Sequence, residues 1–474
     1  MGESKIRLST VYSGVNSIYP KRRFGRLTRL NKLVRMEWSN KLPERHQIIV
    51  VGGGAGGLEL ATKLGKRLGR RRQADIILID SKQTHLWKPL LHQVAAGSLD
   101  VGEQQLEYLA QAHWRHFRFR LGKMTGLDRE QQYVFVAPTY NEKGEEIIPE
   151  RRFYYDTLVI AVGSVSNDFG IKGVREHCLF LDTLVQAQQF QQHLLNRMLY
   201  LHTHQHDDEM GVAIIGAGAT GVELAAQLHT VTRSLSAYGL DELNPERDIK
   251  LHIIEAGPRI LPALPESVME KTCESLERIG VQIHVNERVV EVTRDGVKTA
   301  NGDCIPAGIC VWAAGIKAPD FLRDIDGLET NGINQLVVNK KLQTTHDKNI
   351  FAFGDCAACP DKANTFVPPR AQAAHQQASF LYKALCKRLN GLSSENEYVY
   401  RDYGSLVTLG RYSTVGSLMG AIPGTIFISG YIARMVYLSL YKMHQIAIYG
   451  WFRTTMLTLA KVLRRSVDPE VKLH

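Results

Sequence analysis

The chain has 474 residues, of which 44% are hydrophobic and 22% charged, as in an ordinary globular protein with more than one domain. No uninterrupted apolar run reaches about 18 residues, so we expect no membrane-spanning helix, and seven scattered cysteines indicate a reducing compartment without a disulfide framework. The net charge of +10 comes from the ends, because residues 1–45 hold eleven Lys and Arg against three acids and residues 425–474 hold seven against two. Such ends suit anionic lipid headgroups or nucleic acid.

Residues 1–45 lack the apolar core of a secretory signal. We interpret them as a disordered tail. Three alternatives stay open: an organellar transit-like segment, a membrane-contacting arm, or an extension upstream of a true start at Met36.

The next stretch, QIIVVGGGAGG, predicts a dinucleotide-binding loop. Ile48–Val51 is typical of a buried parallel strand, and Leu58–Leu68 continues at helical spacing. Between them lie three glycines spaced G-x-G-x-x-G: Gly52, Gly54 and Gly57. They permit a tight turn, close approach to a pyrophosphate, and packing of helix on strand. A second strand, Asp75–Ile79, leads to Asp80, which is placed to accept ribose hydroxyls.

Two features follow before the middle of the chain. Residues 85–100, HLWKPLLHQVAAGSLD, are unusually apolar for a loop, and we consider both a structural loop and a lid over the flavin end of a dinucleotide. Residues 117–162 alternate short strands with turns. The last strand, Thr157–Val162, ends at Gly163, where backbone can pass close to a cofactor.

A second fingerprint, VAIIGAGATGVELAAQL, begins at Val212. Its glycines are Gly216, Gly218 and Gly221. The next strand, Ile249–Ile254, is followed by Glu255, at an interval longer than the usual ~20 residues because of a polar insertion around Gly239–Arg247. Two fingerprints predict two dinucleotides.

Residues 349–360, NIFAFGDCAACP, form a strand that runs into Gly354 and Asp355, an acid that can hold a ribityl or pyrophosphate-linked hydroxyl. Cys356 and Cys359 form C-x-x-C, but the redox pair of a disulfide reductase is expected on the first helix, which has no cysteine. No second Cys/His pair has matching spacing, so we predict no metal site.

The last third of the chain contains helical patterns. Residues 368–390 predict a helix on which Gln372 and Gln376 share a face, with His375 more typical of a structural histidine. Residues 421–474 carry two apolar surfaces interrupted by Lys and Arg, which suits two helices lying in a membrane interface. A dimerisation or core-packing helix pair is the alternative.

The order of these segments resembles the two-dinucleotide flavoprotein superfamily, and more closely the type II NADH:quinone oxidoreductases, single-subunit NADH dehydrogenases that do not pump protons. The resemblance runs from about His46 to His474 and rests on both fingerprints, HLWKPLLHQVAAG, YDTLVIAVG, FAFGDCA and the basic-aromatic tail. AQAAHQ, residues 371–376, also matches the family's A-Q-x-A-x-Q quinone-site motif.

The resemblance implies an α/β fold with two Rossmann-like domains and a C-terminal membrane-anchoring region. Its domains would be 46–205 and 326–420 for FAD, 206–325 for NADH, and 421–474 for membrane helices, with 1–45 outside the match. FAD, bound non-covalently, would sit on Gly52, Gly54, Gly57, Asp80, Gly163, Gly354 and Asp355. NADH would sit on Gly216, Gly218, Gly221 and Glu255.

The implied reaction is hydride transfer from NADH to FAD, followed by two-electron reduction of a membrane quinone, ubiquinone or menaquinone. Glu223 would handle protons, and Gln372 and Gln376 would face the quinone. The enzyme would lie on the cytoplasmic face of a bacterial inner membrane, or else on the mitochondrial inner membrane, with a homodimer open.

Two other functions stay open. One is a soluble NAD(P)H-dependent reductase of another acceptor, such as a ferredoxin or a disulfide. The other is a basic flavoprotein with a binding or signalling role, although the near-neutral middle of the chain argues against a nucleic-acid partner.

Overall fold

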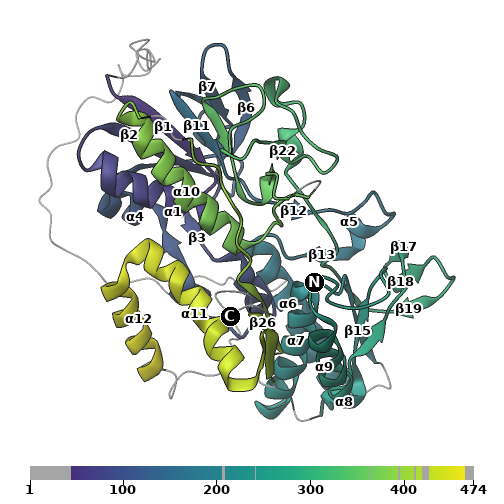
Figure 1. The fold of residues 1–474 in the computed structure, drawn as a ribbon. Coiled ribbons are helices and arrows are strands. Elements are labelled where there is room, and N and C mark those ends of the chain that lie inside the picture. The colour runs from purple at the N-terminus through teal and green to yellow at the C-terminus, as the bar shows by residue number, and fades with distance from the viewer. Residues whose placement is uncertain are drawn as a thin grey trace, which may run out of the picture. The chain divides into compact units, whose positions relative to one another are not determined.

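The computed structural model describes residues 44–204, 209–240, 242–362, 365–392, 395–409, 413–418 and 426–464, whose fold is drawn in Figure 1. Of the basic segment that we interpret as a disordered tail, residues 1–43 lie outside the described chain. Parallel strands alternate with helices over much of the rest, as in an α/β protein.

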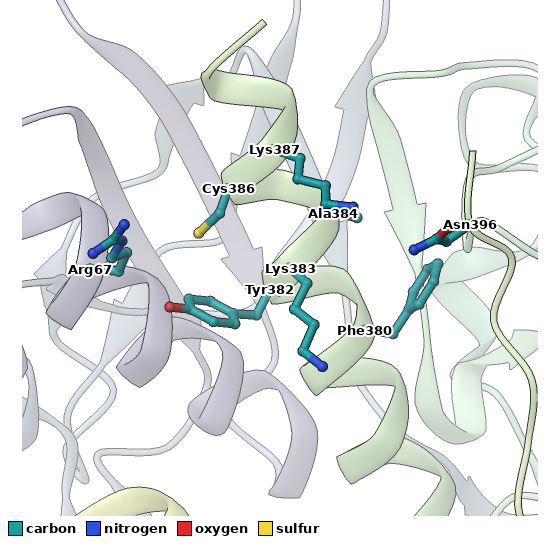
Figure 2. Close-up of a pocket in the computed structure, with 8 residues that line it drawn as sticks. All are labelled: Arg67, Phe380, Tyr382, Lys383, Ala384, Cys386, Lys387 and Asn396. Atoms are coloured by element: carbon teal, nitrogen blue, oxygen red, sulfur yellow. The ribbon is translucent and has the colours of Figure 1, made fainter. Parts of the chain in front are cut away.

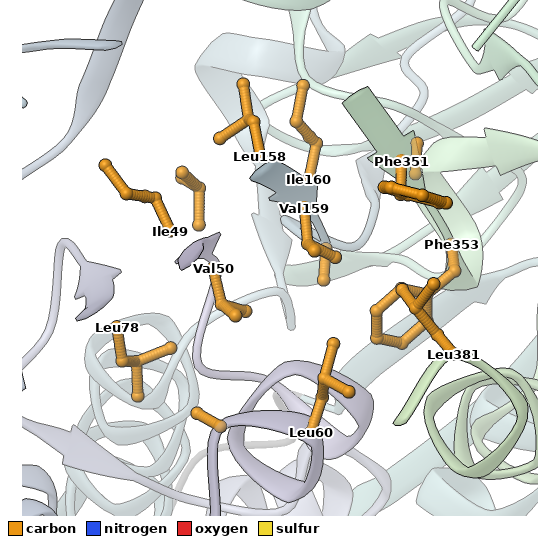
Figure 3. Packing of buried hydrophobic residues seen from close by; sticks show 14 of the residues in the cluster. Ile49, Val50, Leu60, Leu78, Leu158, Val159, Ile160, Phe351, Phe353 and Leu381 are labelled. Carbon is orange, nitrogen blue, oxygen red and sulfur yellow. The ribbon is translucent and has the colours of Figure 1, made fainter. Parts of the chain in front are cut away.

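The first sheet has five parallel strands in the order β23-β11-β1-β2-β5. They are β1 (His46–Val51), β2 (Ala74–Asp80), β5 (Arg118–Leu121), β11 (Thr157–Ile160) and β23 (Ile350–Ala352). Alternate side chains point to opposite faces, so that Val50 and Val159 lie on the side of Leu60 while Ile49 and Leu158 lie on the other (Figure 3). The strands expected around the first fingerprint are confirmed.

Two helices, α1 (Ala55–Leu64) and α10 (Ala371–Leu389), pack against each other beside this sheet. The sequence predicts that the first runs on to Leu68. Instead it passes into a π-helical turn, η1 (Gly65–Gly69), where the chain approaches the end of α4 (Tyr108–Arg115). A Cβ atom at Gly65 would lie 2.3 Å from the Arg115 carbonyl oxygen, so only glycine fits this approach.

The second sheet repeats the first, with five parallel strands in the order β13-β20-β14-β15-β16. They are β13 (Cys178–Phe180), β14 (Met210–Ile215), β15 (Ile249–Ile254), β16 (Gln282–His284) and β20 (Ile309–Trp312). Its helices are α6 (Leu184–His204), α7 (Ala219–Ala237) and α9 (Glu266–Arg278). One edge strand, β13, therefore comes from before residue 206, where we place the start of the NADH domain.

Smaller sheets, strand pairs and short helical segments complete the fold. The antiparallel sheets are β6 (Met124–Asp128) with β7 (Tyr133–Val136) and β10 (Arg151–Tyr154), and β17 (Val289–Thr293) with β18 (Gly296–Thr299) and β19 (Cys304–Pro306). Strand pairs are β3 (Thr84–His85) with β4 (Leu106–Glu107), β8 (Thr139–Tyr140) with β9 (Glu146–Ile148), β12 (Val165–Ser166) with β21 (Ile316–Lys317), and β22 (Leu336–Val337) with β24 (Ala357–Ala358). Short helical segments are η2 (Lys88–Leu90), α2 (Leu91–Ala95), α3 (Val101–Gln104), α5 (Val174–His177), α8 (Pro245–Asp248), η3 (Asp320–Leu322), η4 (Ile325–Gly327) and η5 (Gly354–Cys356).

The C-terminal region differs from expectation in one respect. We expect apolar helices from residue 421, but β25 (Gly404–Leu409), β26 (Ser413–Leu418) and β27 (Ile426–Ser429) form an antiparallel sheet, and α11 (Gly430–Tyr449) begins only after it. Residues 426–428 are two isoleucines around a phenylalanine, which favour a strand where a neighbouring edge is available. α12 (Trp451–Arg464) follows a break at Gly450. No described helix combines the length and the apolar character that crossing a bilayer requires.

Candidate functional site: two phosphate loops and a buried acid

The first fingerprint loop joins β1 to α1. Gly52 has a φ of +102°, and a Cβ there would lie 2.3 Å from the Ala161 carbonyl oxygen, so this position requires glycine. A Cβ at Gly57 would lie 1.9 Å from the Gly52 carbonyl oxygen, whereas a Cβ at Gly54 would meet no atom within 4 Å. The backbone is closely packed at Gly52 and Gly57, whereas the space beside Gly54 is open. The helix that begins here has no acid in its first turn and no side-chain cap. These features suit a bound phosphate.

Asp80 at the end of β2 holds this loop. Its two carboxylate oxygens accept hydrogen bonds from the backbone N–H groups of Gly53, at 2.6 Å, and Lys82, at 2.8 Å. Burial raises the pKa of Asp80, and the Gly53 bond opposes that effect. The carboxylate is thus fixed between the loop and its own strand end.

The second loop, between β14 and α7, repeats this geometry. Gly216 has a φ of +107°, a Cβ at Gly221 would lie 2.1 Å from the Gly216 carbonyl oxygen, and Gly218 is open. Glu255 accepts from the backbone N–H groups of Ala217 and Gly257, both at 2.9 Å. Each half of the molecule thus has a glycine loop, an uncapped helix start and an acid held by two backbone N–H groups.

Arg259 lies four residues after Glu255, and a free guanidinium at this point would favour a 2′-phosphate. Its Nη2 instead donates to the backbone carbonyls of Pro262, at 2.9 Å, and Leu264, at 3.4 Å. The guanidinium is therefore engaged by its own loop.

The other residues expected at the first dinucleotide meet at the ends of β11 and β23, which are neighbours in the sheet. Gly163 has a φ of +71° and is open, and Gly354 has a φ of +74° and donates from its N–H to the Gln377 side chain at 2.8 Å. The Ser164 hydroxyl donates to Asp355 at 2.8 Å. These sequence-distant residues are therefore adjacent.

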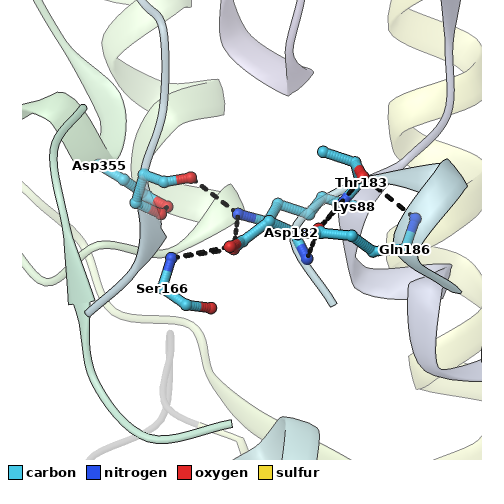
Figure 4. Close-up of polar contacts among 7 residues, drawn as sticks. Lys88, Ser166, Asp182, Thr183, Gln186 and Asp355 are labelled. Atoms are coloured by element: carbon cyan, nitrogen blue, oxygen red, sulfur yellow. Dashed lines mark hydrogen bonds and ion pairs between the residues drawn. The ribbon is translucent and has the colours of Figure 1, made fainter. Parts of the chain in front are cut away.

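A polar network extends from this point to the second sheet (Figure 4). The Lys88 ammonium donates to the Ser164 carbonyl at 2.9 Å and to the Asp182 carboxylate at 3.4 Å, and Asp182 also accepts from the Ser166 N–H at 2.9 Å. Lys88 belongs to the apolar segment 85–100, whose helix α2 packs on α6 and α7 and buries Leu91 and Val94. This segment is a packed part of the core, so its interpretation as a loop is wrong for residues 88–95.

Glu223 on α7 is buried beside this segment. Its Oε1 accepts from the Thr408 N–H at 2.9 Å, and its Oε2 lies 3.6 Å from the Nδ1 of His92. Burial raises the pKa of Glu223 to about 8 and lowers that of His92 to about 4. At pH 7 the carboxyl is therefore mostly protonated and the imidazole neutral. The sequence did not single out His92, because nothing local shows that α2 meets α7.

Gln372 and Gln376 do share one face of α10, but their amides are already engaged. Gln372 donates to Asp402 and to the Gly404 carbonyl, both at 3.2 Å, and accepts from the Tyr403 N–H. Gln376 exchanges two hydrogen bonds with the backbone of Arg401, at 2.8 and 3.1 Å. The two glutamines thus bind an extended segment, residues 401–404, along the helix.

His375, between them, faces the other way. Its Nδ1 is hydrogen-bonded to Glu59 of α1, whose carboxylate also bonds Lys63 and the Ser379 hydroxyl, so this cluster joins α1 to α10. The interpretation of His375 as structural agrees with this position.

The C-x-x-C motif is a pair of buried free thiols. Cys356 and Cys359 are free, and burial raises the pKa of each thiol to about 12, which leaves both protonated and unreactive at neutral pH.

A pocket of about 360 Å³ between η1 and α10, with Arg67, Tyr382 and Cys386 on its walls, contains none of the predicted site residues (Figure 2). Among the described residues no group of three metal-ligating side chains comes together.

The C-terminal helices divide into a packed and an exposed one. α11 packs against α1 and β26, with His444 and Ile448 buried. α12 exposes a series of large apolar side chains: Trp451, Phe452, Met456, Leu457, Leu459, Val462 and Leu463.

Comparison with known proteins gives three results. The family model described as pyridine nucleotide-disulphide oxidoreductase matches residues 46–378. Type II NADH:quinone oxidoreductases are similar, that of Haemophilus influenzae with 42% identity over 90% of this chain and 99% of its own length, and that of Staphylococcus aureus with 29% over 80% and 90%.

Among solved structures, NDH2 from Plasmodium falciparum in complex with NADH matches with a TM-score of 0.74 and 18% identity, over 90% of this chain and all of that one. The sulfide:quinone oxidoreductase of Aquifex aeolicus matches with a TM-score of 0.66 and 19% identity, over 85% of this chain and 92% of that one. These two likenesses concern the fold.

Proposed function

The chain belongs to the type II NADH:quinone oxidoreductases, and we propose that its first loop holds FAD and its second NADH. It is an enzyme that transfers electrons from NADH to a quinone, and its family implies binding of FAD and NAD(P)H. Bound in the first loop, FAD would supply the two-electron redox chemistry that links NADH to the quinone. The observation that carries the assignment of the two sites is the repeated loop geometry, with one acid on each loop.

For FAD we propose the open glycines, Asp80 and Asp355. Gly52 and Gly57 give the loop its shape, the open side of Gly54 admits the diphosphate, and Asp80 takes the adenosine ribose. Asp355, with Gly163 and Gly354 beside it, holds a hydroxyl of the ribityl chain or next to the diphosphate, and the Ser164 hydroxyl orients its carboxylate. The proposal requires only hydrogen bonds, so the FAD is non-covalent.

For the nicotinamide we propose NADH rather than NADPH. Gly216, Gly218 and Gly221 receive the diphosphate, and Glu255 accepts from the two ribose hydroxyls. A 2′-phosphate would meet the Glu255 carboxylate without help from Arg259, whose guanidinium bonds its own loop.

Glu223 is our candidate for proton handling. NADH supplies one hydrogen as hydride, so that making a quinol from a quinone takes one further proton from solvent. A buried carboxyl that keeps its proton up to a pKa of about 8 is able to donate one at neutral pH.

The quinone headgroup, we propose, lies near the 401–404 segment. The hydrogen bonds of Gln372 and Gln376 support a role in fixing this segment as one wall of the site. Their amides would then act on the quinone mainly through the segment they hold.

We propose that α12 lies on an anionic membrane surface. Its exposed apolar side chains and the basic Arg453 and Lys461 suit a helix in the interface. Since NADH is an intracellular reductant, the cytoplasmic face of a bacterial inner membrane fits best, with the mitochondrial inner membrane as the alternative. A homodimer formed through α12 is the competing explanation of its apolar side chains.

The buried, protonated thiols of Cys356 and Cys359 disfavour a disulfide acceptor. The deciding experiment measures NADH oxidation by purified, FAD-loaded protein with a water-soluble quinone, with and without lipid vesicles. We expect quinone-dependent turnover. Turnover with a ferredoxin or a disulfide but not with quinone would overturn the proposal, and FMN in an acid extract would overturn the FAD assignment.

A further inference from the structure

Three segments that are distant in sequence meet around one carboxyl group. Glu223 lies on α7, His92 on α2 and Thr408 on β25. The His92 ring and the Glu223 side chain are 3% and 9% exposed, and their facing atoms, Nδ1 and Oε2, are 3.6 Å apart. The other oxygen, Oε1, accepts from the Thr408 N–H at 2.9 Å.

The hydrogen bonds of His92 determine where its proton lies. Its Nε2 is buried and has no hydrogen-bond partner among the described residues, so its bond to the backbone of Pro89 is made by Nδ1. A carbonyl can only accept, and Nδ1 therefore carries the hydrogen. That N–H group is the part of the ring next to Oε2 of Glu223.

The same reasoning locates the proton of Glu223. Oε1 already accepts from Thr408, so the hydrogen of the neutral acid belongs on Oε2. When the acid gives up this hydrogen to the quinone being reduced to quinol, the Oε2–H bond breaks, the electron pair stays on Oε2, and the charge develops beside His92. A solvent proton later restores the acid.

We propose that His92 is a positioning residue for Glu223: its single Nδ1–H, which it shares with the Pro89 carbonyl, stabilises the carboxylate left when Glu223 releases its proton. This inference rests on the proposed proton-handling role of Glu223. Without a donor at this side, the buried carboxylate would be held only by Thr408, and the acid would part with its proton less readily.

The surroundings support this role. Burial is the main cause of both pKa shifts, the Pro89 and Thr408 bonds oppose it, and no charged group is among these causes. The neighbouring cluster from α2, α6, α7 and β25 is apolar and includes Leu91, Phe190, Leu224 and Val407. In such a site a single N–H donor has a large influence on the charge beside it.

The test is an infrared titration of the FAD-loaded protein, which follows the C=O band of the protonated carboxyl that Glu223→Gln removes. We expect His92→Phe to raise the pKa of Glu223 by up to about one unit, because the carboxylate loses the N–H group beside Oε2. His92→Asn, which keeps an N–H donor near the position of Nδ1, should recover part of the change. His229→Phe, another buried histidine on α7, should leave the pKa unchanged.

Thermal stability and FAD content identify variants that fail to fold. If His92→Phe does not fold, the pKa of Glu223 in His92→Asn is compared with that in the wild type instead. An unchanged pKa in folded His92→Phe, or the absence of a protonated Glu223 band in the wild type, would overturn the inference. Quinone reductase turnover is measured in a separate assay. If Glu223→Gln has full quinone reductase activity at every pH, the proposed role of Glu223 fails, while the infrared titration still decides whether His92 sets its pKa.

Discussion

The Nε2 atoms of His85 and His444 lie 3.0 Å apart and join α11 to the first fingerprint loop. The Nδ1 of His85 is 2.9 Å from the Gly53 carbonyl, which can only accept, so Nδ1 carries the hydrogen and Nε2 accepts from His444. The Tyr108 hydroxyl donates to the same carbonyl at 2.7 Å. The helix that precedes the proposed membrane helix is thus hydrogen-bonded to the loop proposed to hold FAD.

Replacing His444 should therefore loosen this loop. His444→Phe leaves the buried Nε2 of His85 without a donor, which we expect to lower the free energy of unfolding by about 1–3 kcal/mol and to speed FAD release. FAD fluorescence on dilution and urea unfolding measure the two effects. The neighbouring exposed side chain provides the control, Met443→Leu, which should behave as wild type. Unchanged FAD retention in His444→Phe would show that the contact does not support the loop.

The same pair predicts a dependence of stability on pH. Burial lowers the pKa of His85 to about 4 and that of His444 to about 3, against ~6.5 in the unfolded chain. Between these values the unfolded state binds more protons, so stability is complete above pH ~6.5 and falls as the pH falls, by up to about 1.4 kcal/mol per pH unit for each histidine. We expect the melting temperature to drop less between pH 7.5 and pH 5 in His444→Phe than in wild type. Equal drops would exclude His444 as a contributor.

Local sequence was enough to predict most of the two glycine loops and their acids. Gly52 and Gly216 needed only the strand before and the helix after them to be placed, and both acids follow the next strand. The contact of His92 with Glu223 depends instead on packing between segments more than a hundred residues apart. The strand at Ile426–Ser429 was missed because its apolar residues fit a helix equally well, and only the neighbouring edge of β26 decides between the two.

Glu255 should control the choice of nicotinamide cofactor. Glu255→Ser removes the charge that opposes a 2′-phosphate, and we expect the ratio of kcat/KM for NADH to that for NADPH to fall at least about tenfold, or ~1.4 kcal/mol. Arg259→Ala should change the ratio little, because the guanidinium donates to Pro262 and Leu264. Steady-state kinetics with both cofactors measure the ratio. A large change in Arg259→Ala would mean that this side chain moves to the ribose when the cofactor binds.

Gln376 should matter to the quinone half-reaction alone. Gln376→Leu removes two hydrogen bonds to Arg401, and Gln376→Trp also adds bulk beside the 401–404 segment. We expect both to slow flavin reoxidation by quinone about tenfold or more, an effect of about 1.4 kcal/mol, while bleaching by NADH stays near wild type. Stopped-flow absorbance follows each half-reaction, with the exposed Lys383→Ala on the same helix as control. If bleaching slows as much as reoxidation at normal FAD content, the 401–404 segment is not specific to the quinone.

The exposed face of α12 should bind membranes. Trp451 and Phe452 are 72% and 64% exposed, and burying each in the interface contributes roughly 1.5–3 kcal/mol, with ~1 kcal/mol from each nearby Lys or Arg at an anionic surface. We expect the double change Trp451→Ser and Phe452→Ser to weaken cosedimentation with phosphatidylglycerol-containing vesicles more than tenfold, and salt to weaken wild-type binding. Ile147→Ser, on the exposed strand β9, is the matched control and should bind normally. Analytical ultracentrifugation separates the alternative, because a dimer formed through α12 would become a monomer in the double variant while vesicle binding stayed unchanged. If the double variant matches the wild type in both vesicle binding and sedimentation, α12 mediates neither membrane binding nor dimerisation.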